Sequence, residues 1–289
     1  MRKIIKILKM KFIRMEKTRY LFKFYYIGSK KYFGSQRQPN YLTIEENLIT
    51  ALQEKCYITD IKKSGFEVAS RTDRFVSARG SAFSFITDKI PILMEINSAL
   101  PKHIGIWAYT KVPLDYLSRF NAQFRHYKYI IPYFKSSINV KNMKMACKAL
   151  EGRHDFRNFS KQDKEEKKTI RDLDLAKMSI DGDFLIFDFK SRAFLRQQIR
   201  RMVAKILEVG LGIINYEDFV DLFNQAKSIS YQPADPFGLI LWDVNYGSSV
   251  IPTLDKKSKE RMDNYFREKE QKYASKTKLF RLIQHNNIS

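Results

Sequence analysis

The feature that most limits the possible folds is an order of strand-like and helix-like patterns that occurs twice along the chain. In the first half, runs typical of strand, helix, strand, helix and strand follow one another at 20–27, 44–52, 83–86, 93–100 and 104–112. In the second half, strand-like runs lie at 127–133, 173–180, 184–189 and 239–246, and helical patterns lie near 140–150, 195–209 and 217–226. The sequence therefore predicts an α+β fold in which two strand–helix–strand lobes share one extended, mostly antiparallel sheet.

Two short signals fix the ends of these elements. Thr43 and Glu46 form a capping box, in which the threonine hydroxyl and the glutamate each cover a free backbone amide at the start of a helix. Asp181-Gly182 separates two strand-like runs and predicts a tight hairpin, because glycine tolerates the positive φ of such a turn.

By composition and pattern the chain divides into four parts. We expect a basic N-terminal extension at 1–17, an N-terminal lobe at 18–115, a C-terminal lobe at 116–247 and a basic, charged C-terminal tail at 248–289. Lysine or arginine interrupts the apolar residues of the extension every two to four positions, so it lacks the continuous apolar run of a signal peptide or a spanning helix. We therefore expect no membrane attachment.

The charge of the chain is strongly positive, at +22 with an isoelectric point near 9.8. Residues 1–19 contribute +7 and residues 255–289 contribute +5, which leaves +10 for the body. Such an excess attracts polyanions and says nothing about the fold. Nucleic acid is the leading partner class, and an anionic membrane surface is the second.

Cysteine and histidine are too few for a disulfide framework or a structural metal site. The two cysteines, Cys56 and Cys147, each lie in or at the end of an apolar helical pattern, and we expect both to be small core residues. The four histidines show no metal-ligand spacing. These observations favour a cytoplasmic protein without a bound metal.

The segment at 68–78, VASRTDRFVSA, holds an Arg-Thr-Asp triplet between two strand-like runs. On chemistry alone, Thr72 and Asp73 are ordinary turn-forming residues and the arginines are surface charges. Five further segments occur with it in order: 34–39 (GSQRQP), 125–131 (RHYKYII), 152–159 (GRHDFRNF), 193–200 (AFLRQQIR) and 236–239 (PFGL).

Together these six segments resemble the TruA family of tRNA pseudouridine synthases, whose catalytic loop is written A-G-R-T-D-x-G-V-x-A. The resemblance covers residues 18–247, and the GSQRQP form is most similar to archaeal members. It implies the pseudouridine synthase fold, with a basic cleft between the lobes and the Asp73 loop on the N-terminal lobe. It also implies an isomerase that acts as a homodimer on tRNA, at tRNA positions 38–40 of the anticodon stem-loop.

The catalytic-loop segment departs from the family pattern at two positions. Ser70 stands where the family has the glycine before the arginine, and Phe75 stands where it has the glycine two residues after the aspartate. If either position requires a positive φ, we expect strain there, above all at the bulky Phe75.

The chemistry of the implied reaction explains the residues that it needs. Conversion of uridine to pseudouridine breaks the N1–C1′ bond, turns the uracil and rejoins it through C5, so it is redox-neutral and needs no cofactor. The resemblance assigns the one required carboxylate to Asp73, either as a nucleophile or as the base that removes the C2′ proton. It assigns Arg200 as the partner cation, which compensates the carboxylate for the water lost in a tight pocket. Without the resemblance, a solvated arginine or a phosphate contact is the simpler interpretation of Arg200.

The remaining predicted site residues bind the base or the RNA. Tyr127 maps onto the family's active-site tyrosine, where it could stack on uracil with its phenol near C5; a core tyrosine on a strand is the alternative. Arg71 resembles the arginine that fills the space of the extracted nucleotide. Basic and polar side chains expected to contact RNA are Arg37, Gln38, Arg125, Lys128 and Arg196.

Two other interpretations stay open on the sequence. A tRNA-binding relative without activity is conceivable because of Ser70 and Phe75. A metal-dependent nuclease or transferase is disfavoured, because no further carboxylates or histidines cluster near Asp73.

Overall fold

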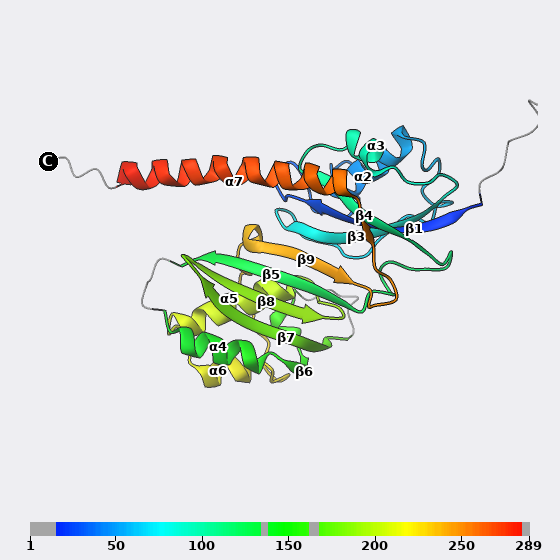
Figure 1. The fold of residues 1–289 in the computed structure, drawn as a ribbon. Helices are drawn as coiled ribbons and strands as arrows, with labels where there is room; N and C mark the ends of the chain where they lie inside the picture. The colour runs from blue at the N-terminus through cyan, green and yellow to red at the C-terminus, as the bar shows by residue number, and fades with distance from the viewer. Residues whose placement is uncertain (1–15, 134–137, 162–167, 285–289) are drawn as a thin grey trace, which may run out of the picture.

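The computed structural model describes residues 16–133, 138–161 and 168–284, and these build a ten-stranded sheet with helices packed against it (Figure 1). The strands are β1 (Thr18–Tyr26), β2 (Glu67–Val68), β3 (Ser77–Thr87), β4 (Ile104–Val112), β5 (Phe124–Pro132), β6 (Gly152–Asp155), β7 (Ile170–Asp181), β8 (Phe184–Ser191), β9 (Leu239–Asn245) and β10 (Thr253–Leu254). The α-helices are α2 (Ile44–Glu54), α3 (Leu93–Ser98), α4 (Val140–Ala149), α5 (Gln198–Gly210), α6 (Tyr216–Asp221) and α7 (Lys256–Gln284), and two 3₁₀ turns are η1 (Arg157–Phe159) and η2 (Pro236–Gly238).

The sheet joins the two halves of the chain through one parallel strand pair. Its order is β10-β4-β1-β3-β9-β5-β8-β7-β6, with β2 paired to β3 at the side. The pairing of β3 with β9 is parallel, at Ser77 with Ile240 and Ala78 with Leu241, and the other registered pairs are antiparallel. The predicted α+β class with one extended, mostly antiparallel sheet is therefore confirmed.

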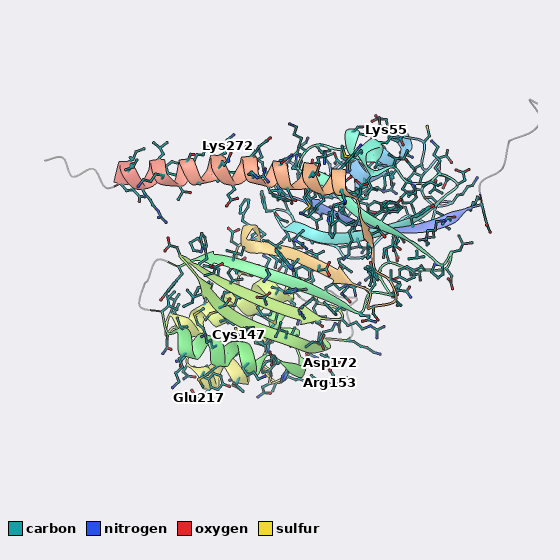
Figure 2. The ribbon with its side chains drawn as sticks, in the orientation of Figure 1. Lys55, Cys147, Arg153, Asp172, Glu217 and Lys272 are labelled. Atoms are coloured by element: carbon teal, nitrogen blue, oxygen red, sulfur yellow. The ribbon has the colours of Figure 1, made fainter. Side chains whose placement is uncertain are left out.

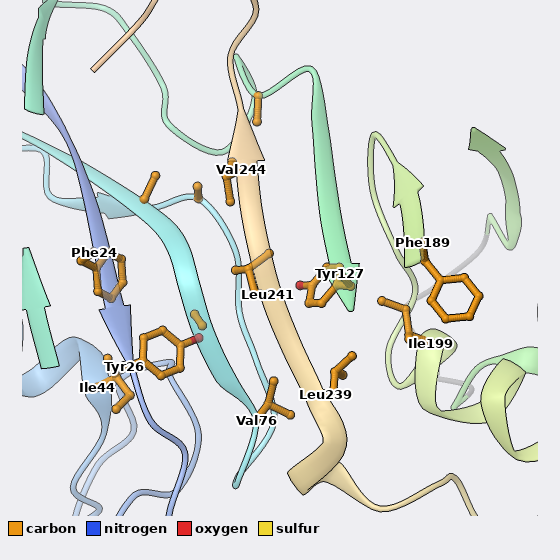
Figure 3. Packing of buried hydrophobic residues seen from close by; sticks show 14 of the residues in the cluster. Phe24, Tyr26, Ile44, Val76, Tyr127, Phe189, Ile199, Leu239, Leu241 and Val244 are labelled. Carbon is orange, nitrogen blue, oxygen red and sulfur yellow. The ribbon is translucent and has the colours of Figure 1, made fainter. Parts of the chain in front are cut away.

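The apolar core continues across this junction. Figure 3 shows Phe24 and Tyr26 of β1, then Leu241 of β9, then Tyr127 of β5, and finally Ile199 of α5 in one packed layer. These side chains are at most 7% exposed. Because the same core spans both halves, loops from the first half are held against helices from the second half.

The first helix of the N-terminal half begins as the sequence predicts. The N–H of Glu46 donates to the Thr43 hydroxyl at 3.2 Å, which is the threonine part of the predicted capping box. The carboxylate of Glu45 instead accepts from the N–H of Arg37 at 2.9 Å. This bond ties the loop before α2 to the first turn of the helix.

Several predicted elements differ from the structure at their ends. Helix α5 begins at Gln198 instead of 195, because Gln197 has a left-handed backbone with φ of 58°. Helix α6 ends at Asp221 instead of 226. Strand β7 begins at Ile170, so the charged loop expected at 161–172 is shorter, and its residues 162–167 lie outside the described residues.

The expectation that both cysteines are core residues is half wrong. Cys147 is buried on α4, against the sheet (Figure 2). Cys56 is exposed, because it follows the end of α2 with φ of 55°, which turns the chain out of the helix.

The C-terminal residues return to the N-terminal half. Strand β10 pairs with β4, and α7 is anchored by Arg261, which donates to the carbonyls of Asn97, Leu100 and Ile104 at 3.3–3.5 Å. Residues 271–284 of α7 are exposed, as Lys272 illustrates (Figure 2), and Arg281 near the end of the helix pairs with Asp183 at 3.0 Å. The tail expected at 248–289 thus contains a strand and a long helix.

Most of the expected N-terminal extension, residues 1–15, lies outside the described residues. Among the residues that are described, no helix has both the length and the apolar character needed to cross a membrane.

Candidate active site

Asp73 lies in the loop between β2 and β3, and two neighbouring segments hold that loop in place. The Ser35 hydroxyl accepts from the N–H of Thr72 at 2.7 Å, and the N–H of Ser35 donates to the Thr72 carbonyl at 3.1 Å. The phenol of Tyr26, at the end of β1, hydrogen-bonds the Thr72 hydroxyl at 2.7 Å. Thr72 therefore fixes the backbone on which Asp73 sits, in agreement with the expectation that it shapes the turn.

Asp73 is paired with Arg200 from the other half of the chain. Nη1 of Arg200 lies 3.0 Å from Oδ2 of Asp73, and Nε donates to the Ala234 carbonyl at 2.7 Å. The Arg200 side chain is 11% exposed and that of Asp73 is 39% exposed. The arginine is thus fixed by the protein, whereas the carboxylate is still open to a ligand.

The stretch before β9 holds the first turn of α5. The N–H of Ala234 donates to the carbonyl of Arg200 at 3.0 Å. Arg200 is therefore bound to Ala234 twice, through its backbone carbonyl and through its side-chain Nε. The phenol of Tyr129 donates to the carbonyl of Asp235 at 2.5 Å. The stretch before β9 therefore aims the Arg200 guanidinium at Asp73.

Tyr127 lies on β5 in the core layer next to this pair. Its ring stands edge-on to Phe194 with the centroids 5.3 Å apart, and Figure 3 shows it beside Leu241. Burial raises the pKa of Tyr127 to about 12; the Arg125 charge opposes this shift and the Asp73 charge adds to it. At neutral pH Tyr127 is therefore a neutral phenol, which can donate a hydrogen bond or a proton.

Arg125 is buried under the loop, with its guanidinium directed into the protein. Its guanidinium donates to three carbonyls, those of Ala69 at 3.0 Å, Arg119 at 2.5 Å and Arg192 at 2.6 Å. Its Nε also donates to the Ser70 hydroxyl at 3.3 Å, and the residue is only 8% exposed. With its donors directed inward, Arg125 supports the Asp73 loop, in place of the RNA contact that the sequence suggested.

The two departures from the family motif differ in their consequences. Ser70 has an ordinary backbone and a partner in Arg125. Phe75 has φ of +70°, in the left-handed region that favours glycine. A Cβ on Gly28 would lie 2.2 Å from the carbonyl carbon of Phe75, so the loop passes directly over that glycine. The expected strain at Phe75 is present.

The other predicted RNA-binding residues lie in different places. Arg71, Arg37 and Gln38 are exposed on the two loops that meet at Thr72, although the Gln38 amide donates to the Phe33 carbonyl at 2.6 Å. Arg196 is exposed on the turn before α5.

Lys128 is separated from the site by the sheet itself. It follows Tyr127 on β5, so it points to the opposite face. There its Nζ pairs with Asp188 at 2.7 Å and lies 5.2 Å from the centre of the Trp242 ring. The structure therefore does not bring Lys128 to Asp73.

Sequence reasoning missed the residues that position the site. Ser35, Tyr26 and Ala234 act through backbone or hydroxyl hydrogen bonds, and the residue type alone does not predict such a bond. Ser35 had a signal, since it lies inside the GSQRQP segment. Among the described residues, no three histidine, cysteine or acidic side chains gather as a metal site would require.

Comparison with known proteins identifies similar chains. The profile of a family described as tRNA pseudouridine synthase matches residues 146–247, a region that includes Arg200. A protein named tRNA pseudouridine synthase A from Methanosarcina mazei is 35% identical over 228 residues, which cover 78% of this chain and 83% of that protein. Proteins of the same name from Methanosphaera stadtmanae, with 37% identity over 76% of this chain and 81% of that one, and from Archaeoglobus fulgidus, with 32% identity over 94% and 99%, are also similar.

Proposed function

Because the chain belongs to the tRNA pseudouridine synthase A family, and is therefore an isomerase that makes pseudouridine in tRNA, we propose that Asp73 is its catalytic carboxylate. The ion pair of Asp73 with Arg200 carries this proposal. It joins the loop after β2 to the first turn of α5, at the place where the two halves of the sheet meet.

The surroundings of Asp73 hold its carboxylate in place and leave part of it accessible to a substrate. Arg200 supplies a positive charge at 3.0 Å, and its second contact to Ala234 prevents it from turning away. The accessible part of Asp73 then faces the reacting sugar or uracil.

Tyr127 completes the proposed site as the residue next to the uracil. The reaction breaks the N1–C1′ bond and forms the C5–C1′ bond; N1 gains a proton, and C5 releases its proton to water. A neutral phenol can stack on the base and hydrogen-bond an oxygen of the ring, and the pKa of about 12 keeps Tyr127 in that form. The exposed Arg71, two residues before Asp73, would occupy the space of the extracted nucleotide.

The target that we propose is a uridine at tRNA positions 38–40 of the anticodon stem-loop, bound in a basic cleft between the lobes. The positive charge of +22 supports a polyanionic substrate. We also propose a homodimer in the cytoplasm. Light scattering on the purified chain should then give twice the 34.2 kDa of one copy, and a mass of one copy at micromolar concentration would contradict the dimer.

Tritium release from tRNA transcripts labelled at uridine C5 tests the catalytic assignment. Wild-type protein should release tritium in the presence of a chelator, and the Asp73→Asn variant should not. Mapping the product should place pseudouridine at positions 38–40. If neither protein releases tritium while both bind tRNA, the chain is a binding protein without this activity, and the assignment of Asp73 fails.

The same reaction can separate the two roles open to Asp73. Deuterium at C2′ of the target uridine slows the reaction if Asp73 removes that proton. It has little effect if the carboxylate attacks C1′. Either result requires the wild-type protein to be active first.

A further inference from the structure

Beside Asp73, five side chains pack against one another in a row, which we call the ring row: Tyr41, Phe33, Arg74, Phe75 and Phe237. The rings of Tyr41 and Phe33 lie 4.3 Å apart, and those of Phe75 and Phe237 lie 4.5 Å apart. The Arg74 guanidinium joins the two pairs, at 4.4 Å from the Phe33 ring and 5.0 Å from the Phe75 ring.

The ring row combines three segments that are distant in sequence. Tyr41 and Phe33 belong to the loop before α2, Arg74 and Phe75 directly follow Asp73, and Phe237 lies in η2 before β9. The row therefore crosses from one half of the chain to the other, as the Asp73–Arg200 pair does.

Three rings of the row are partly open to solvent. Phe33 is 39% exposed, Tyr41 is 49% exposed and Phe237 is 60% exposed, although all three are large apolar rings. Contiguous exposed apolar groups mark binding surfaces. Arg74 is held in the row by a hydrogen bond to the Lys30 carbonyl at 2.7 Å, so its planar face is fixed as well.

The backbone of Phe75 indicates that this ring serves more than the fold. Its φ of +70° is a conformation that residues with a side chain rarely adopt, and a glycine would adopt it freely. The ring of Phe75 lies against Phe237 and Arg74, which are both exposed. An observed strain of this kind next to a reactive group points to a function for the side chain.

The chemistry of the ring row fits unpaired nucleobases. Aromatic rings and guanidinium planes stack on bases of any sequence, and Lys30, Lys31, Arg37 and Arg71 are exposed basic residues on the same two loops. We propose that the ring row stacks the unpaired bases next to the target uridine, and so replaces the stacking lost when that uridine enters the site. The link to the target uridine rests on the proposed role of Asp73.

Fluorescence of 2-aminopurine tests this directly. An anticodon stem-loop RNA carrying 2-aminopurine next to the target uridine should be quenched on binding wild-type protein. Phe237→Ala and Phe75→Gly should each lose much of the quenching and bind about tenfold more weakly, which corresponds to about 1.4 kcal/mol. The salt dependence of binding should keep its slope, because phosphate contacts are unchanged. Phe184→Ala is the matched control, since Phe184 is a 44% exposed ring at the β7–β8 hairpin, and it should behave as wild type.

The thermal melting temperature separates a binding role from a packing role. Phe75→Gly removes the strained backbone, so its melting temperature should not fall while its RNA affinity does. The inference is overturned if both variants quench and bind as wild type, or if they weaken binding only as far as Phe184→Ala does. If wild-type protein releases tritium and the ring-row variants quench and bind as wild type does, this inference alone is refuted. If wild-type protein releases no tritium but the ring-row variants lose quenching, base binding by the ring row is supported and the catalytic role of Asp73 is refuted.

Discussion

Replacing Arg200 with alanine should lower both the free energy of unfolding and the rate of isomerisation. The guanidinium makes two hydrogen bonds, to Asp73 at 3.0 Å and to the Ala234 carbonyl at 2.7 Å, and its side chain is 11% exposed. Both bonds disappear in the variant, and Asp73 keeps its charge without a partner.

The size of the effect follows from how far the pair is buried. Breaking a fully buried pair costs about 3–5 kcal/mol, because the remaining charge has no water. A fully exposed pair contributes about 0–1 kcal/mol. Asp73 is 39% exposed, so water can partly replace Arg200. We therefore expect a loss of about 2–3 kcal/mol in unfolding free energy, of which about 1–2 kcal/mol is coupling with Asp73.

The effect on the reaction uses the same coupling. If Arg200 supports the ionised carboxylate during catalysis, a loss of about 1–2 kcal/mol slows the reaction roughly five- to thirtyfold. A double-mutant cycle of Arg200→Ala with Asp73→Asn, measured by urea unfolding, isolates the coupling energy. Tritium release measures the rate of Arg200→Ala.

Arg281→Ala is the control for this experiment. Its ion pair with Asp183 has the same N–O distance of 3.0 Å, but the two side chains are 53% and 55% exposed. It should lose less than about 1 kcal/mol and keep full activity. A coupling energy near zero for Arg200 and Asp73, with a stability loss no larger than that of Arg281→Ala, would refute the reasoning.

Three further predictions concern the support of the site. Arg125→Ala should lower the unfolding free energy by about 3 kcal/mol or more, since three carbonyls lose a charged donor. The slope of tRNA affinity against salt concentration should stay unchanged, and a smaller slope would show that Arg125 contacts RNA. Stability should fall as pH rises above 10, because the unfolded chain then loses the protons of Tyr127 and of other tyrosines such as Tyr129, while the folded protein keeps them up to a pKa of about 12. Between pH 9 and 11 the free energy of urea unfolding should fall by roughly 1 kcal/mol less in Tyr127→Phe than in wild type, and an equal fall would contradict the buried phenol. Gly28→Ala should displace the Asp73 loop and abolish activity, because the new Cβ would lie 2.2 Å from the Phe75 backbone. Gly182→Ala is the control, since a Cβ there meets nothing within 4 Å; it should cost only about 1 kcal/mol of unfolding free energy for its φ of +56° and stay active.

The order of elements was predictable from the sequence because it depends on local periodicity. Apolar residues at every second or every third to fourth position indicate strands and helices from the local sequence alone. The threonine cap at Thr43 and the hairpin at Asp181-Gly182 are local for the same reason, and both are present, with residues 182–183 forming the turn. Element ends such as that of α5 were less predictable, because the left-handed Gln197 is set by its neighbours.

Alternation along a strand held information that the sequence interpretation did not use. Tyr127 and Lys128 are adjacent on β5, so both cannot face the same side of the sheet. Once Tyr127 is placed at the site, Lys128 must lie on the other face, where it pairs with Asp188.

What the sequence by itself determined is the fold class, the order of the elements and the family motifs that single out Asp73, Tyr127 and Arg200. Only the tertiary structure decided how these residues are held. Arg200 reaches Asp73 across 127 positions of sequence, and Arg125 reaches the carbonyl of Ala69 across 56. A carbonyl is present at every residue, so no residue type marks which one a buried arginine will bind. Which carbonyls lie within reach depends on how the two halves pack, and the parallel pairing of β3 with β9 brings these halves together.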